Sequence, residues 1–422
     1  MRSRIWNQRR RSAGIFAITL LLAVACATPL AAQSFTQKPK VRAITAFLRL
    51  DRAAYAAQIA DTLKMLRRTK AIMEKGGYEV QTIRIVTQPF PEYTKSLSRE
   101  DALNFFRALD ALAQKEDFDP NVGPAMLRDS DDPAQAELLA EVLCTTKLNA
   151  SIVIAAEDGI HWNAVRAAAK LVKYVSEHSP HSQGTFGFAA TAMLAPYAPF
   201  YPGAYHTGAG KQFAVALEAA NVVDEAFTGT HGDARAASER LTKALGTHAA
   251  AIEKLALAAA QETGWTYIGM DATPAPLKDV SIGAAIEKFT GVRLGASGTL
   301  LAASIITAAV KAAPVKHVGY SGLMLPVLED VRIAQRWSEG ALTLDALLAY
   351  SAVCGAGLDT IPLPGDVTVE QMERMMADVA ALALKWKKPL SARLQPVAGK
   401  KSGDRTDFDD PFLVNAVIQK VP

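Results

Sequence analysis

Short apolar runs alternate with amphipathic helical patterns along most of this 422-residue chain. Residues 41–50 form the first such run. Residues 53–75 then place Tyr55, Ile59 and Leu63 near one face of a helix, and Gly76-Gly77 favours a left-handed helix end. Strands separated by helices are typical of crossover units, which build a largely parallel sheet or barrel. The pattern therefore predicts an α/β fold.

The same pattern continues to the C-terminus. The further segments predicted as strands are 78–86, 151–156, 185–190, 212–217, 265–271, 315–325, 390–396 and 413–418. The further predicted helices are 98–115, a helix ending at 144, 162–175, 234–262, 281–289, 297–312, 342–354 and 369–386. A loop rich in Pro and Asp is expected over 117–132. We find no internal repeat and no linker, so residues 33–422 are expected to form a single large α/β domain.

The first 32 residues have the layout of a secretory signal peptide. Five arginines precede an apolar run over 15–25, and cleavage is expected after Ala32. The run is shorter than the roughly 20 residues that span a bilayer. The alternative is a lipid anchor at Cys26. We therefore expect an exported protein, periplasmic or secreted.

Removing this segment changes the charge balance. The whole chain has 46 Lys and Arg against 42 Asp and Glu, whereas the chain without those five arginines has 41 against 42. A near-neutral surface gives no reason to expect nucleic acid or an anionic membrane as partner. No other stretch is apolar and long enough to span a membrane. Only Cys144 and Cys354 remain, and whether they pair is open at this stage.

Five blocks, in this order, resemble the family known as domain of unknown function 711. They are Cys-Thr-Thr-Lys-Leu-Asn at 144–149, Phe-Tyr-Pro-Gly-Ala-Tyr-His-Thr-Gly at 200–208, Gly-Met-Asp-Ala-Thr-Pro-Ala-Pro at 269–276, the block at 318–330 and the block at 354–366. The resemblance implies a pyruvate formate-lyase-like α/β barrel with mostly parallel strands and crossover helices. The activity of the family is unassigned.

The fold name suggests glycyl-radical chemistry, which we do not expect here. Such enzymes need a glycine in a C-terminal loop, and residues 412–422 contain none. They also need a pair of active-site cysteines, whereas Cys354 stands alone in its block. A fold by itself does not carry a function.

Acidic residues follow apolar runs or turns in the family blocks, where barrel sites collect functional groups. Asp271, Glu329, Asp330 and Asp359 are candidate ligands of a divalent cation, the one cofactor that we consider. Alternatively, one of these carboxyls acts as a general acid beside an ionised one. For Asp330 and for Asp366 the competing interpretation is a helix N-cap.

His206 lies in a loop rich in Gly and Tyr and is a candidate base, against the alternative of an ordinary surface histidine. Cys354 is a candidate nucleophile, against the alternative of a buried structural thiol. With Asp271 and Asp359 these residues form the predicted catalytic set. The leading hypothesis is an exported enzyme that acts on a small polar metabolite by acid–base chemistry, with or without a metal ion. The alternative is an exported solute-binding protein without turnover.

Overall fold

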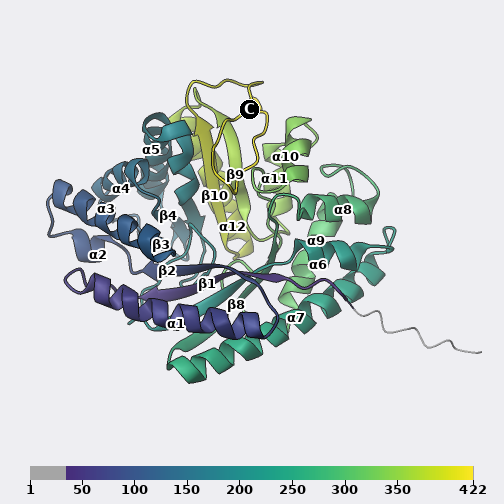
Figure 1. The fold of residues 1–422 in the computed structure, drawn as a ribbon. Coiled ribbons are helices and arrows are strands. Elements are labelled where there is room, and N and C mark those ends of the chain that lie inside the picture. The colour runs from purple at the N-terminus through teal and green to yellow at the C-terminus, as the bar shows by residue number, and fades with distance from the viewer. Residues whose placement is uncertain (1–34, 422) are drawn as a thin grey trace, which may run out of the picture. The chain divides into compact units, whose positions relative to one another are not determined.

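The first strand, β1 (Lys40–Leu48), is buried from its second residue onward, as expected for a strand with neighbours on both sides and layers on both faces. It belongs to a computed structural model that describes residues 35–421 (Figure 1). The chain from Phe35 onward forms one compact unit. The expected signal peptide and Cys26 lie outside the described residues.

Nine strands form one continuous path in the order β8-β7-β1-β2-β3-β4-β6-β10-β9, and β5 pairs with β4 beside it. Neighbouring strands are parallel except at the β1–β7, β6–β10 and β4–β5 pairs. The mostly parallel sheet with crossover helices confirms the predicted α/β class. The other strands are β2 (Val80–Thr87), β3 (Asp119–Pro124), β4 (Asn149–Ala156), β5 (Gly159–Ile160), β6 (Phe188–Ala192), β7 (Gln212–Glu218), β8 (Thr266–Ala275), β9 (Gly357–Pro364) and β10 (Leu390–Val397).

Helices cover the outside of the sheet, and α1 packs against α7 along the lower side of Figure 1. Several begin at a residue whose side chain accepts a hydrogen bond from a backbone N–H of the first turn. Ser98 accepts a hydrogen bond from the backbone N–H of Asp101 at the start of α3, for example. The helices are α1 (Tyr55–Lys75), α2 (Pro91–Thr94), α3 (Arg99–Glu116), α4 (Ala134–Thr145), α5 (Trp162–His178), the 3₁₀ segment η1 (Pro180–Gly187), α6 (Ala220–Phe227), α7 (Ala234–Thr263), α8 (Ile282–Thr290), α9 (Thr299–Lys311), α10 (Val331–Ser338), α11 (Leu344–Ser351) and α12 (Val369–Trp386).

Residues 316–331, here called the closing segment, link the two ends of the strand path. Met270 in β8 exchanges two backbone hydrogen bonds with this segment, at 2.7 and 3.1 Å, and Val327 N–H donates to the carbonyl of Asp359 in β9 at 3.0 Å. The predicted strand at 315–325 was wrong, because the segment makes only an isolated bridge there. Both ends of the path are nevertheless joined, as the closure of a barrel requires.

The loop 193–211 fills the space that the strands surround. One apolar cluster joins Phe200 and other loop residues to Ala43 of β1, Ala216 of β7 and Ala275 of β8, which lie on different strands. The loop is also tied to the sheet by polar contacts, since the Thr45 hydroxyl donates to the carbonyl of Pro199 at 2.9 Å. The loop therefore packs against inner side chains of the sheet, and a cavity remains at one mouth of the strands.

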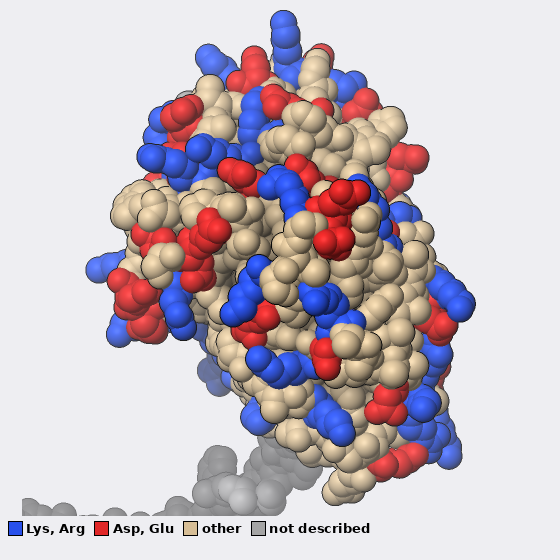
Figure 2. All heavy atoms as spheres, turned by 90° about the vertical axis from the view of Figure 1, so that its left-hand side faces the viewer, with Lys and Arg blue, Asp and Glu red and all other residues tan. Residues whose placement is uncertain are grey.

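The surface over α1 to α5 carries basic and acidic side chains interspersed, without a large area of one sign (Figure 2). This pattern agrees with the near-neutral balance calculated from the sequence. Within residues 35–421, no helix combines the length and the apolar character needed to cross a bilayer.

Candidate functional site

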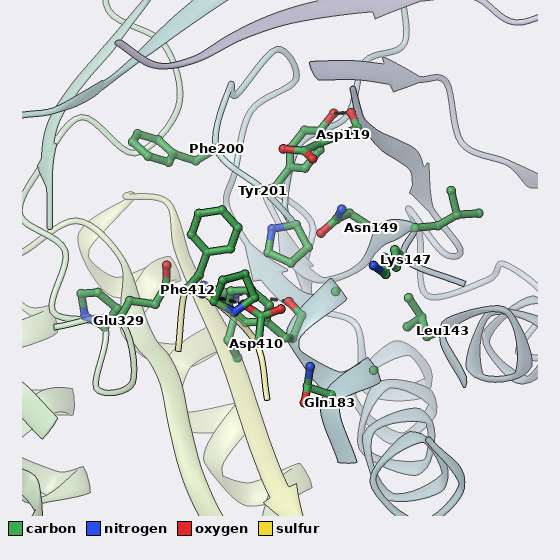
Figure 3. A pocket seen from close by; sticks show the side chains of 18 of the residues that line it. Asp119, Leu143, Lys147, Asn149, Gln183, Phe200, Tyr201, Glu329, Asp410 and Phe412 are labelled. Atoms are coloured by element: carbon green, nitrogen blue, oxygen red, sulfur yellow. Dashed lines mark hydrogen bonds and ion pairs between the residues drawn. The ribbon is translucent and has the colours of Figure 1, made fainter. Parts of the chain in front are cut away.

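A cavity of about 760 Å³ opens at the mouth of the strands, between β1 to β4 on one side and β9 and β10 on the other (Figure 3). A cavity of this size suits a small-molecule ligand. Three arginines line it from within strands: Arg42 in β1, Arg84 in β2 and Arg393 in β10. Each is buried, which is rare for arginine unless the charge has a partner.

Arg393 holds two carboxylates with one nitrogen. Its Nη1 lies 2.8 Å from an oxygen of Glu329 and 2.8 Å from an oxygen of Asp359. The two carboxylate oxygens are therefore no farther apart than twice that distance. A negative charge held this close to a carboxyl group favours the protonated form of that group. The arrangement thus places two acids on one cation at the cavity wall.

Asp359 is the member of this pair that is poised to change protonation. Burial raises its pKa to about 6, the Arg393 guanidinium opposes the rise, and the Glu329 carboxylate adds to it. A carboxyl group with a pKa near 6 can both give and take a proton near neutral pH. The predicted catalytic role of Asp359 therefore has a geometry that suits it, and it stays a prediction.

Arg42 also contacts Glu329, one of the two acids that Arg393 holds, and it links this acid to Glu218. Its guanidinium nitrogens lie 3.2 Å from Glu218 and 3.7 Å from Glu329. The ring of Phe412 lies against this guanidinium, with 5.3 Å between the ring centroid and Cζ. Arg42 is therefore compensated by two acids and covered by an aromatic ring.

Arg84 is the least compensated of the three arginines. Its nearest acid is Asp119, at 3.6 Å, and its Nε donates to the Thr82 hydroxyl at 3.0 Å. Neither terminal nitrogen forms a hydrogen bond with any residue in the described part of the chain. Burial lowers the pKa of Arg84, and the nearby Arg42 charge lowers it further. A buried guanidinium with free donors at a cavity wall is suited to bind an anion.

Tyr320 lines the cavity and is fixed from behind by Asp271. The Asp271 carboxylate is fully buried and accepts hydrogen bonds from the backbone N–H groups of Tyr320 and Ser321, at 2.7 and 3.1 Å. It also accepts from the N–H and the hydroxyl of Thr273. Burial raises the pKa of Asp271 to about 6. Asp271 thus lies behind the cavity wall and shapes the turn that carries Tyr320.

Asp330 caps two helices at once. Its carboxylate accepts from the N–H groups of Arg332 and Ile333 at the start of α10, and from those of Ile282 and Gly283 at the start of α8. This agrees with the N-cap interpretation. The other acid with that interpretation, Asp366, is exposed, and Thr368 caps α12 instead.

The four acids predicted as metal ligands therefore have separate partners, except that Glu329 and Asp359 share Arg393. Among residues 35–421, no group of three or more His, Cys, Asp and Glu side chains is placed to hold a metal ion. Binding of a metal ion by Asp271, Glu329, Asp330 and Asp359 stays a prediction, and the arrangement of these four side chains does not add support to it.

His206 lies at the opposite end of β1 from the cavity. Its Nε2 is 3.0 Å from the carbonyl oxygen of Leu48, and six residues at roughly 3.3 Å each separate Leu48 from Arg42 along the strand. Burial lowers the pKa of His206 to about 4. His206 is thus a buried loop residue, and the structure does not bring it together with Asp359.

Cys354 is buried beside Ala356, which lines the cavity. Its Sγ lies 3.9 Å from the Ser351 hydroxyl, and burial raises the pKa of its thiol. Lys388 Nζ donates to its backbone carbonyl. Cys144 and Cys354 are both free thiols, so they do not pair.

The three arginines were missed in the sequence, although a signal for them exists. Each is a charged residue within a segment predicted as a strand, at positions 42, 84 and 393. Where such a strand is buried, the charged residue has to find a partner or line a cavity. The periodicity of apolar residues predicted the strands, whereas the site is lined by the charged residues that depart from this periodicity.

The model of the family described as uncharacterised ACR (DUF711) matches residues 35–409. A UPF0210 protein of Pyrobaculum islandicum is 32% identical over 374 residues, which cover 84% of this chain and 82% of that protein. A UPF0210 protein of Pyrobaculum arsenaticum is 33% identical, with 82% and 80% covered. One from Bifidobacterium longum subsp. infantis is 29% identical, with 80% and 79% covered. These names state no activity.

Proposed function

The chain belongs to the DUF711 family of uncharacterised proteins, and we propose that it is an enzyme that binds a small carboxylate at Arg84 and moves a proton on it through Asp359. The proposal rests on the burial of Arg84 at the cavity wall and on its free hydrogen-bond donors. It is 8% exposed, it lines the cavity, and its terminal nitrogens form no hydrogen bond within residues 35–421. A substrate carboxylate would supply the missing partner.

Asp359 supplies the acid–base group in this proposal. In its ionised form it takes a proton from the carbon next to the bound carboxylate, and the electron pair of the C–H bond moves onto the carboxylate as an enediolate. Arg84 stabilises this added negative charge. Asp359 then exchanges this proton with the solvent and returns a hydrogen to the same carbon, on the original or the opposite face. The Glu329 charge favours the protonated form of Asp359, which is the form that the step creates.

Exchange of carbon-bound hydrogen in D₂O tests the step without knowledge of the full reaction. Small carboxylates with a hydrogen on the neighbouring carbon are incubated with the protein and followed by proton NMR. We expect loss of that signal with at least one compound, and no loss with Arg84→Met or Asp359→Asn. Arg374→Met, an exposed position on α12, is the matched control and should behave as wild type.

The alternative is a solute-binding protein without turnover. Phe412 covers part of the cavity mouth by lying over Arg42, an arrangement that also suits retention of a ligand. Binding that depends on Arg84 without any hydrogen exchange would favour this alternative. Absence of both binding and exchange across the panel would refute both candidates.

Export is also part of the proposal, and the layout of residues 1–32 supports it. N-terminal sequencing of the protein recovered from a periplasmic or culture fraction tests it. A mature chain that begins at Gln33 is the expected result. A chain that keeps its first residues and stays in the cytoplasm would contradict export, and a lipidated Cys26 would favour the anchor.

A further inference from the structure

Asp410 gives the cavity a second charge with free hydrogen-bonding atoms, opposite in sign to that of Arg84. It lines the cavity, and its carboxylate accepts a hydrogen bond from the N–H of Phe412 at 2.8 Å. Within residues 35–421 no Lys, Arg or His lies at ion-pair distance from it. Burial raises the pKa of Asp410, the Glu329 charge adds to this rise, and the more distant charges of Lys147 and Lys278 oppose it. The Asp410 carboxylate therefore has no cation in direct contact within residues 35–421.

The two charges lie in different parts of the cavity. Arg84 stacks on the ring of Tyr201, with 4.6 Å between Cζ and the ring centroid, and its acid neighbour is Asp119. Figure 3 shows Tyr201 and Asp119 together, and Asp410 beside Phe412 across the open space from them. The cavity thus offers a cation in one part and an anion with an aromatic neighbour in another.

We propose that the ligand is a small zwitterion, an aminocarboxylate whose carboxylate binds Arg84 and whose ammonium group lies beside Asp410. This inference rests on the proposed function, because it takes Arg84 as the carboxylate site. An ammonium group has three donors and no acceptor, which suits a carboxylate without a cation. The ring of Phe412 adds a surface that attracts cations. A ligand with both charges would compensate both ends of the cavity at once.

Pairs of compounds that differ only in the ammonium group test the inference. Isothermal titration of the protein compares L-alanine with propanoate, 4-aminobutanoate with butanoate, and 5-aminopentanoate with pentanoate. We expect the amino member of at least one pair to bind about tenfold more tightly, the size expected for one charged hydrogen bond. Arg84→Met should weaken both members of that pair.

Asp410→Asn isolates the second charge. The asparagine oxygen can still accept from the N–H of Phe412, so the local backbone contact is retained. We expect this variant to lose the preference for the amino compound and to bind the plain carboxylate as wild type does. Asp378→Asn, which removes the same charge from an exposed position on α12, should keep the preference.

The outcomes separate this inference from the proposed function. If plain carboxylates bind through Arg84 but the amino members are not preferred, the zwitterion is refuted and the carboxylate site stands. A preference that survives Asp410→Asn would likewise refute the role of Asp410. If no compound of either kind binds in a way that depends on Arg84, both proposals fail.

Discussion

Asp330→Ala should destabilise two helices through the loss of one side chain. The carboxylate accepts hydrogen bonds from four backbone N–H groups, two in α8 and two in α10, and from the hydroxyl of Ser281. The loss of one N-cap costs about 1–2 kcal/mol when its donors stay buried. Two caps therefore contribute about 3 kcal/mol. At roughly 2.1 cal/mol/K per residue, a domain of this size should lose about 4 °C in Tm.

Thermal unfolding followed by circular dichroism checks this value. Thr343→Ala is the matched control, because Thr343 caps only α11, through the N–H of Ala346. We expect this control to cost about 1 kcal/mol. If Asp330→Ala lowers Tm no more than Thr343→Ala does, a single carboxylate does not hold both helices. A wild-type Tm that falls with a chelator, and an Asp330→Ala Tm that does not, would instead indicate a metal ligand.

Three further changes probe the cavity wall. Because the pKa of Asp359 is about 6 in the folded protein and 3.8 ordinarily, the folded chain binds more protons between these values, so its free energy of unfolding should fall as pH rises from about 4 to 6. Asp359→Asn should flatten that fall in urea unfolding measured across this range, and an unchanged slope would contradict the assignment. Arg393→Met should cost about 3–5 kcal/mol in urea unfolding, because two buried acids lose their shared cation. Part of that loss should be recovered when Asp359→Asn is added, and no recovery would argue against the coupling. Gly203→Ala would place a methyl group 2.7 Å from the Tyr320 hydroxyl and should cost about 1–3 kcal/mol in calorimetric unfolding, and no measurable loss would contradict this close packing.

Most helices and most strands could be predicted from periodicity, but β3, β9 and the two-residue β5 could not. β3 reads Asp-Pro-Asn-Val-Gly-Pro and was predicted as a loop, because its residues favour turns. It is a strand because β2 and β4 pair with it on both sides, and its register shifts between Asn121 and Pro124. β9 contains Pro362 and Pro364, which are tolerated because this strand ends the path and β10 is the one described strand that forms a ladder with it.

The converse error occurred at 413–418, where an apolar run was predicted as a strand. The run makes only an isolated bridge, through Val417. Its apolar side chains are satisfied by packing, since Leu413, Ala416 and Ile418 are buried without sheet partners. The short helices α6 and α10 were also missed. Each has eight residues, too few for the helical period to stand out.

The candidate site was predictable only in part. Asp359 and Glu329 were identified by their place in the family blocks, and the structure brings both to the cavity. Their shared partner, Arg393, comes from a strand that follows Asp359 by 34 residues, and sequence spacing cannot reveal such a contact. Asp271 and His206 were predicted as catalytic residues on the same grounds as Asp359. The three-dimensional fold is needed to tell that the Asp359 carboxylate lines the cavity and that the Asp271 carboxylate lies behind the cavity wall.

The closing segment also covers backbone groups that could otherwise pair with a second copy of the protein. An open strand path ends in two rows of backbone groups that can pair with another chain and start aggregation. Here Met270 and Asp359 at the two ends already have partners in residues 316–331, and this irregular stretch cannot extend the ladder. Asp271 anchors it through Tyr320 and Ser321. A loss of that anchor should therefore appear first as self-association through β8, before the fold itself is lost.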